Sequence, residues 1–385
     1  MQDYDIVING AGIPGLLLAL LLDRECRPGQ LRILLLDRSR PQPDEQLLQP
    51  PQSIDDFDLR VFAITEASRC LFERVNAWPG SASARVYPYQ HMHVWDAGGP
   101  GKVHFDAADL GTAALGYIVE GRVLQDALAR QLSTASSVEL VAADELVTYE
   151  AGDTHIAIKL QSGREITAKL LVGADGANSR VRELAGIEMV GWSYGQQAIV
   201  ATVETETDHQ HTAWQRFLPE GPLAFLPMQS PWCSIVWSVS EQRAESLHAL
   251  DKADFMQALA SDFDYRLGNI VDVGERARFP LKLSHARAYS APRVVLVADA
   301  AHTVHPLAGQ GLNLGLQDVA GLMHQLSQAL ETGRDIGSRR VLRAYERNRK
   351  GDNWLMQGSF DALKRLFSND QRFLTQLRNA GLSSV

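Results

Sequence analysis

The residues best suited to chemistry in this sequence stand in a polar, glycine-rich segment at 299–318, DAAHTVHPLAGQGLNLGLQD. The segment follows a short apolar run at 294–298, which reads as a buried strand, and precedes a long stretch with helical periodicity. A loop between a strand and the start of a helix directs backbone N–H groups at the group it binds. The segment is therefore suited to an anionic or electron-rich ligand.

Asp299, His302 and His305 stand three residues apart in this segment and raise the alternative of a metal site. Pro306 breaks the helical geometry that would align these side chains, and no fourth ligand stands nearby. Glycine allows close approach of the backbone to a ligand. The loop holds two such glycines, Gly309 and Gly311. We therefore predict that the segment binds a ligand through its backbone, and we predict no metal site.

A second glycine-rich loop stands near the N-terminus, where Gly10, Gly12 and Gly15 follow an expected strand and open an expected helix. In such a loop the first glycine permits the tight turn, the second lets a pyrophosphate approach, and the third lets helix and strand pack closely. Asp37 ends the next expected strand, where a carboxylate accepts hydrogen bonds from ribose hydroxyls. The unit predicts dinucleotide binding; a glycine-rich turn kept for packing is the alternative.

A third segment, GADGANSRVR at 173–182, follows an apolar strand at 170–172. The pair Asp175-Gly176 suits a tight turn, and the arginines after it begin an expected helix. Taken alone, this segment is typical of a surface turn.

The composition favours a soluble enzyme. The 385 residues are 45% hydrophobic and 22% charged, enough for one large or two medium domains. The net charge of −9, without a long basic run, argues against nucleic acid as a partner. The three scattered cysteines indicate neither a disulfide framework nor a cysteine zinc site and fit a reducing cytosol. An apolar run at 13–22 is preceded by acidic rather than basic residues, so we expect a buried helix, not a signal peptide.

The elements that position these loops follow from periodicity and composition. Strands are expected at 4–9, 31–36, 138–141, 155–160, 165–172 and 294–298, and helices at 14–24, 65–75, 123–132, 251–261 and 310–332. Two more helices are expected at 338–350 and 352–366. The stretch 197–239 is rich in β-formers and aromatic residues, which is typical of an antiparallel sheet.

We predict an α/β protein with a discontinuous Rossmann-like nucleotide-binding domain, an inserted antiparallel-sheet substrate domain and C-terminal helices. The nucleotide-binding domain is expected at 1–76, 107–183 and 277–350. The β-rich substrate domain is expected at 77–106 and 184–276, and a helical tail at 351–385.

The three glycine-rich segments together resemble the class A flavin monooxygenases, which carry a G-x-G-x-x-G, an Asp-Gly and a G-D-x-x-x-P-type motif on one chain. The run 305–318 is similar throughout to the signature of the ubiquinone-biosynthesis hydroxylases, the UbiH/UbiF family. The resemblance spans nearly the whole chain and includes 59–64, 116–120, 172–178, 224–227 and 345–349. The stretches 214–222 and 352–357 look most like the branch that hydroxylates the demethoxy-ubiquinol ring.

The resemblance implies FAD as cofactor and gives some residues roles toward its nucleotide half. Gly10, Gly12 and Gly15 would receive the pyrophosphate, and Asp37 the adenosine ribose. Asp175 and Gly176 would touch FAD and line the approach of NAD(P)H.

Other residues would lie toward the flavin half of the cofactor. Arg60 would contact FAD or pack beside the flavin, and Asp299 would bind ribityl hydroxyls. Pro306, next to His305, would lie at the flavin face beside the substrate. Backbone N–H groups around Leu312 and Asn313, after Gly309 and Gly311, would point at the flavin C2 carbonyl, where a helix N-terminus stabilises negative charge.

The chain departs from the family pattern at two positions. Ala298 stands where the family usually has glycine, just before Asp299. Gly121 stands where the family often has Asn or Arg, and Arg122 directly after it is the expected substitute for a cofactor contact.

The resemblance implies a hydroxylase that uses NAD(P)H and O2 through a flavin C4a-hydroperoxide. The substrate would be a polyprenyl phenol or quinol, most closely 2-polyprenyl-3-methyl-6-methoxy-1,4-benzoquinol. Alternatives are another ring position, or an unrelated aromatic or prenyl compound. A flavin-dependent halogenase is disfavoured because W-x-W-x-I-P is absent, and a plain NAD-binding dehydrogenase would leave 173–182 and 299–318 unexplained.

The implied substrate also predicts where the protein works. Burying each CH2 of a prenyl tail contributes about 0.8 kcal/mol, so the tail should stay in lipid or in an apolar groove. We expect a cytoplasmic protein, peripheral at the inner face of the cytoplasmic membrane or part of a ubiquinone-biosynthesis complex. The arginine-rich stretch 339–350 is a candidate lipid contact, and a solvated charged face is the alternative.

Overall fold

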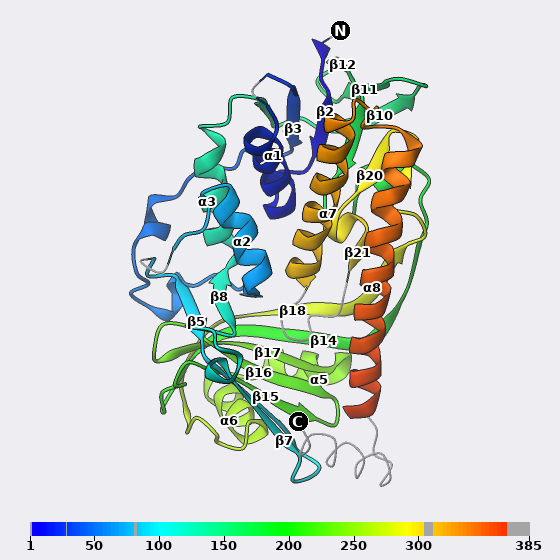
Figure 1. Ribbon diagram of the computed structural model, residues 1–385. Coiled ribbons are helices and arrows are strands. Elements are labelled where there is room, and N and C mark those ends of the chain that lie inside the picture. The colour runs from blue at the N-terminus through cyan, green and yellow to red at the C-terminus, as the bar shows by residue number, and fades with distance from the viewer. Residues whose placement is uncertain (1, 28, 81–82, 304–310, 368–385) are drawn as a thin grey trace.

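The computed structural model describes residues 2–27, 29–80, 83–303 and 311–367. A nucleotide-binding half with a mostly parallel sheet lies at the top of Figure 1, and a large mixed sheet lies below it. These two halves are the α/β architecture expected from the sequence. No described helix combines the length and the apolar character that crossing a membrane requires.

The parallel sheet carries the three glycine-rich loops. Its strands follow the order β19 (Ser290–Ala291), β20 (Val294–Leu296), β13 (Leu170–Gly173), β2 (Ile6–Asn9), β3 (Ile33–Asp37) and β9 (Val138–Ala142), and only β19 runs antiparallel to its neighbour. Strands β2, β13 and β20 are fully buried, which accounts for their unbroken apolar sequences. Because parallel strands end at one edge, the loops after β2, β13 and β20 meet there.

Four helices begin at the same edge. Helix α1 (Ile13–Glu25) and the short α4 (Arg180–Leu184) pack on this sheet, and α3 (Gly121–Leu132) and α7 (Gly311–Glu331) pack beside α1. Residues 15–22 of α1 are all buried, so the apolar run near the N-terminus is a core helix, as predicted. Figure 1 shows α1 beside β2 and β3.

The large sheet has eight strands in the order β21 (His302–Thr303), β18 (Ile270–Ala286), β14 (Met189–Thr205), β17 (Trp232–Ser240), β16 (Gly221–Pro227), β15 (Thr212–Leu218), β6 (His91–Asp96) and β7 (Lys102–Asp106). Neighbours are antiparallel except β15 and β6. Helices α5 (Glu241–Ala249) and α6 (Lys252–Asp262) contribute Leu247 and Phe255 to a core with Ile235 and Trp237 of β17.

Smaller elements complete the chain. One small sheet joins β4 (Val61–Ile64), β8 (Gly116–Glu120) and β5 (Val86–Tyr89), and another joins β1 (Gln2–Asp3), β12 (Glu165–Ala168), β11 (Ile156–Leu160) and β10 (Leu146–Ala151). The remaining elements are α2 (Glu66–Arg74) and four short 3-10 helices, η1 (Glu45–Leu48), η2 (Ile54–Asp56), η3 (Ala107–Leu110) and η4 (Ala298–Ala300).

The prediction of two helices at 338–350 and 352–366 is wrong, because one helix, α8 (Arg339–Phe367), covers both. A glycine within a helix costs only about 1 kcal/mol, and Gly351, where the break was expected, does not end the helix. The buried Asn353, which donates to Asp318 Oδ1 at 3.2 Å, instead holds this turn of the helix against α7. The expected domain boundaries at 276/277 and 350/351 fall inside β18 and α8.

Candidate functional site

A cavity of about 870 Å³ lies where the glycine-rich loops face the large sheet. Ligand pockets typically have roughly this volume. One end is lined by backbone and polar side chains of the nucleotide-binding half, including Gly10, Gly12, Asp37 and Asp299. The other end is a mostly apolar wall from the large sheet, formed by Ala198, Val200, Leu226, Ser234, Val236 and Phe279. The cavity can therefore hold a molecule with one polar and one apolar end.

The three glycines of the first loop serve different purposes. Gly10 has a φ of +109°, and a Cβ there would lie 2.4 Å from the carbonyl oxygen of Ala174. A Cβ on Gly15 would lie 1.9 Å from the carbonyl oxygen of Gly10. Among the described residues, a Cβ on Gly12 would meet only the Pro14 ring, at 3.9 Å, while Gly12 itself lines the cavity. Gly10 and Gly15 are required for packing, and Gly12 leaves space open to a ligand.

The start of α1 offers donors to an anion in this space. Gly12 is the N-cap of α1 and provides no side-chain cap, so the first N–H groups of the helix keep their capacity to bind a ligand. The carboxylate of Asp37 accepts Ala11 N at 2.6 Å, and it also accepts the N–H and hydroxyl of Ser39. A carboxylate has about four acceptor positions, so Asp37 braces the loop and keeps capacity for a ligand hydroxyl.

Asp175 and Gly176 line the cavity, but the Asp175 carboxylate is largely used inside the protein. It accepts Asn9 Nδ2 at 2.9 Å, Arg180 N at 2.8 Å and Val181 N at 3.1 Å, and Ser179 Oγ donates to it at 2.5 Å. The carboxylate thus fastens the start of α4 to the end of β2. Together with Gly176, whose φ is +80°, it shapes a turn that faces the cavity.

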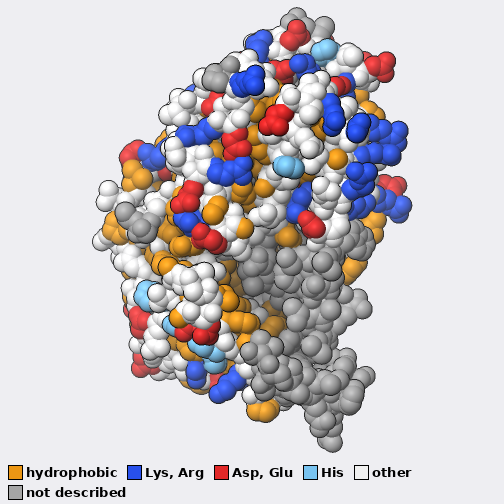
Figure 2. Space-filling model, in the orientation of Figure 1, with side chains coloured by type: hydrophobic (Ala, Val, Ile, Leu, Met, Phe, Trp, Pro, Cys, Tyr) orange, Lys and Arg blue, Asp and Glu red, His pale blue; other side chains and the backbone are white. Residues whose placement is uncertain are grey.

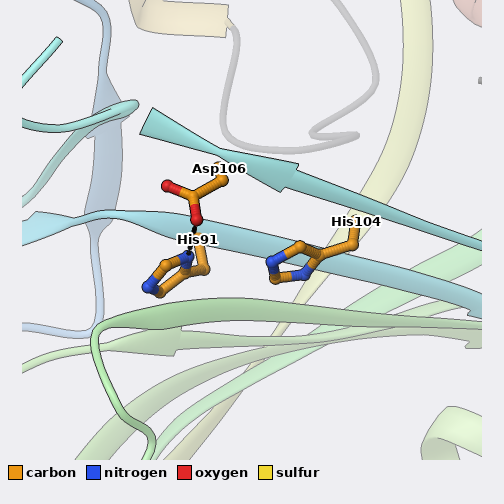
Figure 3. Close-up of side chains that lie close together, drawn as sticks. All are labelled: His91, His104 and Asp106. Atoms are coloured by element: carbon orange, nitrogen blue, oxygen red, sulfur yellow. Dashed lines mark ion pairs between the residues drawn. The ribbon is translucent and has the colours of Figure 1, made fainter. Parts of the chain in front are cut away.

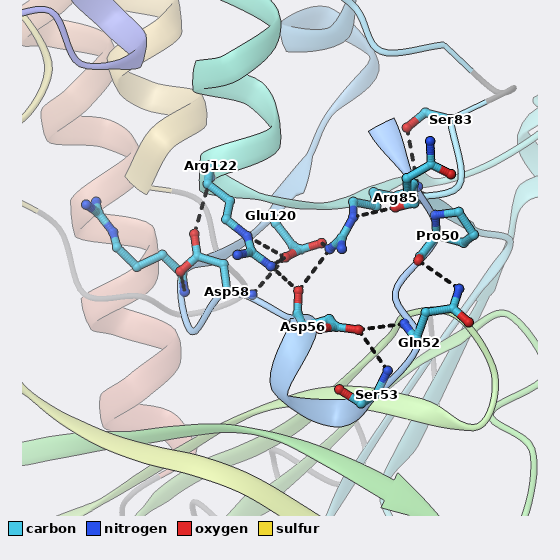
Figure 4. A network of polar contacts seen from close by, with 11 residues as sticks. Pro50, Gln52, Ser53, Asp56, Asp58, Ser83, Arg85, Glu120 and Arg122 are labelled. Atoms are coloured by element: carbon cyan, nitrogen blue, oxygen red, sulfur yellow. Dashed lines mark hydrogen bonds and ion pairs between the residues drawn. The ribbon is translucent and has the colours of Figure 1, made fainter. Parts of the chain in front are cut away.

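A buried ion-pair network positions the side of the cavity formed by 58–62. The Glu120 side chain, fully buried, pairs with Arg85 Nη1 at 2.8 Å and with Arg122 Nη2 at 3.1 Å (Figure 4). Arg122 also donates its side chain to the carbonyl of Asp56 and its backbone N–H to Asp58 Oδ2 at 3.2 Å. Arg122 lines the cavity as expected, but its guanidinium points into this network.

The departure at Gly121 has a packing reason. A Cβ there would lie 3.0 Å from the ring of Phe62 and 3.3 Å from the carbonyl oxygen of Arg60. The small residue lets α3 start directly against Arg60, the residue before β4, whose N–H donates to Asp58 Oδ1 at 3.0 Å. Arg60 itself lines the cavity.

The other departure, Ala298, sits in a left-handed turn with a φ of +54°. Its methyl group occupies the space that Gly315 leaves open, since a Cβ on Gly315 would lie 2.7 Å from it. The next residue, Asp299, lines the cavity and has an exposed side chain. The protein packed around its carboxyl still removes enough water to raise the pKa of Asp299, against the opposing charges of His302 and Arg60.

The start of α7 forms the wall after this turn. Gly311 and Leu312 line the cavity. The side chain of Asn313 turns away to β4, where its Nδ2 donates to the carbonyl of Ala63 at 2.7 Å and its Oδ1 accepts Thr65 N at 3.1 Å. The expected sites His305, Pro306 and Gly309 lie outside the described residues.

Sequence reasoning missed the residues that support the cavity from behind. Asp318 of α7 accepts hydrogen bonds from His302, Arg349 and Ala298 N, and none of these pairs has a spacing that marks it in the sequence. The sequence indicated His302 only as a possible metal ligand. Glu120 ends the stretch 116–120, which resembles the family. That resemblance was the sequence feature that could have indicated a role for Glu120.

These residues fit FAD. The open space beside Gly12 and the uncapped start of α1 suit a pyrophosphate, Asp37 suits a ribose, and the apolar wall suits a ring system. One cavity would thus have room for both halves of the cofactor, with further space toward the sheet.

Comparison with known proteins agrees with this fit. The model of a family described as FAD binding domain matches residues 106–357. The chain is 38% identical over 384 residues to the 3-demethoxyubiquinol 3-hydroxylase of Escherichia coli, covering 100% of this chain and 95% of the relative. It is 35% identical over 425 residues to the mitochondrial ubiquinone biosynthesis monooxygenase COQ6 of Xenopus tropicalis, covering 99% and 90%.

Among solved structures, PqsL of Pseudomonas aeruginosa superposes with a TM-score of 0.78 over 100% of both chains at 20% identity, which supports the fold. The FAD family match and the full-length identities together establish an FAD-dependent monooxygenase. This chain belongs to the ubiquinone-biosynthesis FAD-dependent monooxygenases, the UbiH/COQ6-type family whose signature the sequence carries.

Proposed function

We propose that the protein hydroxylates the ring of 2-polyprenyl-3-methyl-6-methoxy-1,4-benzoquinol, with NAD(P)H and O2 as co-substrates. The 38% identity to the 3-demethoxyubiquinol 3-hydroxylase of Escherichia coli, over the full chain, is the observation that carries this ring position. The stretches 214–222 and 352–357, which resemble the same branch, support it.

FAD, when bound, supplies the redox chemistry that activates O2 for ring hydroxylation. The residues of this chain bind and orient the reactants. Gly12 and the start of α1 would hold the pyrophosphate, and Asp37 would hold the adenosine ribose. Asp299, which opens into the cavity beside Arg60, would receive ribityl hydroxyls.

The wall of the large sheet would receive the substrate ring. Ala198, Val200, Leu226 and Val236 offer aliphatic contacts there, and Phe279 offers an aromatic one. Apolar contacts of this kind exclude water, which favours attack on the ring over loss of the activated oxygen. Phe279 is 44% exposed, so the wall continues to the surface, where a prenyl tail can leave the cavity.

The matching test uses Escherichia coli deletion strains, each lacking one ubiquinone-ring hydroxylase. The gene for this chain is expressed in each strain, and quinone intermediates are identified by mass. We expect ubiquinone to be restored in the strain lacking the 3-demethoxyubiquinol hydroxylase. Rescue of a different strain would assign another ring position. Rescue of none, with soluble FAD-loaded protein present, would refute a role in ubiquinone synthesis.

A second candidate is hydroxylation at the ring position used by the COQ6 proteins. It is favoured by the 35% identity to COQ6 of Xenopus tropicalis, which also covers 99% of this chain. The deletion-strain experiment separates the two, because the accumulated intermediates differ in mass by the missing ring substituent.

We further propose that the protein works at the surface of the cytoplasmic membrane or within a ubiquinone-biosynthesis complex. Figure 2 shows Lys and Arg side chains gathered over the first half of α8, where Arg339, Arg340, Arg343 and Arg347 are exposed. Basic side chains near anionic lipid contribute about 1 kcal/mol each. Co-sedimentation with anionic but not neutral vesicles, reduced by changing these arginines to glutamine, is the expected result.

A further inference from the structure

The hairpin of β6 and β7 carries four side chains that can ligate a metal, in the pattern His91-x-His93 on one strand and His104-x-Asp106 on the other. Residues two apart on a strand point to the same face of a sheet. The register pairs His91 with Asp106 and His93 with His104. All four side chains therefore gather on one face of the hairpin.

Three of these side chains converge closely. Ligand atoms of His91, His104 and Asp106 lie within 4.8 Å of one another. Among the described residues, no other three His, Cys, Asp or Glu side chains come this close together. The rings of His91 and His104 stack with centroids 5.5 Å apart, at 20°. Figure 3 shows the three side chains beside the β6–β7 hairpin, with the ion pair between His91 and Asp106 as a dashed line.

His91 and Asp106 form a long ion pair, and the same spacing also suits a metal ion held between them. Nδ1 of His91 lies 3.4 Å from Asp106 Oδ2, and this buried nitrogen has no hydrogen-bond partner among the described residues. Two ligands of a tetrahedral zinc ion, each about 2.0–2.1 Å from the metal, are separated by about 3.3 Å. The buried nitrogen is satisfied if a cation lies between it and the carboxylate.

The group lies on the face of the large sheet that points away from the cavity. Trp95 and Trp214 lie on the same face and pack together and against Phe263, after the end of α6. Met92, on the opposite face, packs in a cluster with Leu226, which lines the cavity. A ligand at this hairpin is thus separated from the flavin cavity by the thickness of the sheet.

We propose that His91, His104 and Asp106 bind a divalent transition-metal ion of the Zn2+ type, with a remaining position open to water. Two imidazoles and one carboxylate are ligands for Zn2+ rather than for Mg2+ or Ca2+, which favour oxygen. The open side is solvent, because His91 and Asp106 are each 32% exposed and His104 is exposed.

The position on the sheet assigns the ion a role. β7 is the edge strand of the eight-stranded sheet, beside β6. An ion held by His91 and by His104 and Asp106 joins the edge strand to its neighbour. A ligand that binds only the folded state raises the stability of that state in proportion to the logarithm of its concentration. The site is therefore a clamp on the edge strand and takes no part in the hydroxylation.

The test uses tag-free, FAD-loaded protein stripped with a chelator and then titrated with ZnCl2 by calorimetry. We expect one strong site per chain and a higher Tm with Zn2+. His91→Ala, His104→Ala and Asp106→Asn should each weaken Zn2+ binding at least tenfold and remove the rise in Tm. His248→Ala, which removes an exposed histidine of α5, is the matched control and should bind as the unchanged protein does.

FAD absorbance and circular dichroism show whether each variant is folded. His104→Ala should disturb the fold least, because His104 is exposed. A visible spectrum typical of tetrahedral coordination after replacement of Zn2+ by Co2+ gives a second readout. Absence of a strong Zn2+ site in the unchanged protein would overturn the proposal. So would Zn2+ binding of equal strength in folded His104→Ala and Asp106→Asn.

Discussion

The carboxylate of Asp318 and Nε2 of His302 lie 2.5 Å apart in the protein interior, with both side chains fully buried. The same carboxylate accepts Ala298 N at 3.0 Å and Arg349 Nε at 2.9 Å. One acidic group on α7 thus joins the turn before the cavity to α8. Burial alone raises the pKa of this carboxyl, but His302 and Arg349 outweigh that effect and hold the pKa below its ordinary value.

The first prediction concerns this carboxylate. Asp318→Asn removes the one buried carboxylate that pairs with the Arg349 guanidinium among the described residues; Asn353 and the 70% exposed Asp352 still accept from this guanidinium, which is only 10% exposed. Breaking a buried ion pair from one side costs roughly 3–5 kcal/mol. We expect a loss of about 3 kcal/mol in the free energy of unfolding, measured by urea denaturation.

Glu331→Gln is the matched control for this variant, because Glu331 is exposed at the last turn of the same helix. It should change the free energy of unfolding by less than about 0.5 kcal/mol. A double variant that also carries Arg349→Met should recover part of the stability lost in Asp318→Asn. Equal stability of Asp318→Asn and the unchanged protein would contradict the ion-pair account.

The second prediction is a pH dependence of stability. Burial, with the neighbouring His302 and Lys350, lowers the pKa of His285 to about 4. In the unfolded chain this pKa is about 6.5. Between these values the unfolded state binds the proton and the folded state does not, so stability falls as the pH drops. The free energy of unfolding should decrease by roughly 2–3 kcal/mol between pH 7 and pH 4.5.

His285→Gln isolates this contribution. Burial also lowers the pKa of His93 and His209, and both remain in the variant. The unchanged protein should therefore lose more stability than His285→Gln over the same range, as measured by urea denaturation at each pH. Parallel curves for the two proteins would show that His285 does not titrate in this window.

The third prediction concerns the apolar wall of the cavity. Val236 of β17 lines it at the end away from Gly12. Val236→Trp should fill the place of the substrate ring, lower kcat/KM at least tenfold and leave the FAD content unchanged. Val271→Trp on β18 adds the same bulk at a side chain that is 53% exposed, and it should keep full activity. Loss of FAD from Val236→Trp would place the cofactor at the wall instead.

Much of the nucleotide-binding half could be predicted because each of its strands and loops is specified by a short continuous stretch of sequence. The apolar runs that precede Gly10, Gly173 and Ala298 are continuous in the sequence, and parallel strands bring their ends together whatever the distance along the chain. The identity of the cofactor, FAD, was then inferred from the resemblance to the family. The structure brings described residues of these loops to one cavity.

The contacts behind these loops could not be predicted in the same way. Glu120 and Arg85, or Asp318 and Arg349, stand far apart in the sequence, and each pairing depends on the packing of whole elements. The role of Asp175 shows the same limit. Its Asp-Gly motif identified the turn, but only the fold reveals that the carboxylate fastens Asn9 and the start of α4. Local sequence specified the turns, and tertiary packing specified the partners.

The last prediction separates ligand binding from packing within one loop. Gly12 has an ordinary φ of −71°, and its missing Cβ points to open space among the described residues. Gly12→Val should therefore fold normally, yet place its side chain where the pyrophosphate would lie. We expect at least a hundredfold weaker FAD binding, measured by fluorescence titration of the apoprotein. Gly351→Ala, at an exposed and unobstructed position of α8, should bind FAD normally.

Gly10→Ala provides the contrast in the same loop. Its Cβ would lie 2.4 Å from a backbone oxygen, at a φ of +109°, so the loop itself must move. This variant should lose stability before any ligand is added, whereas the apoprotein of Gly12→Val should unfold at the same urea concentration as the unchanged apoprotein. Normal FAD affinity in Gly12→Val would mean that the loop serves packing alone, and equal destabilisation of both variants would mean that Gly12 has no separate role toward the cofactor.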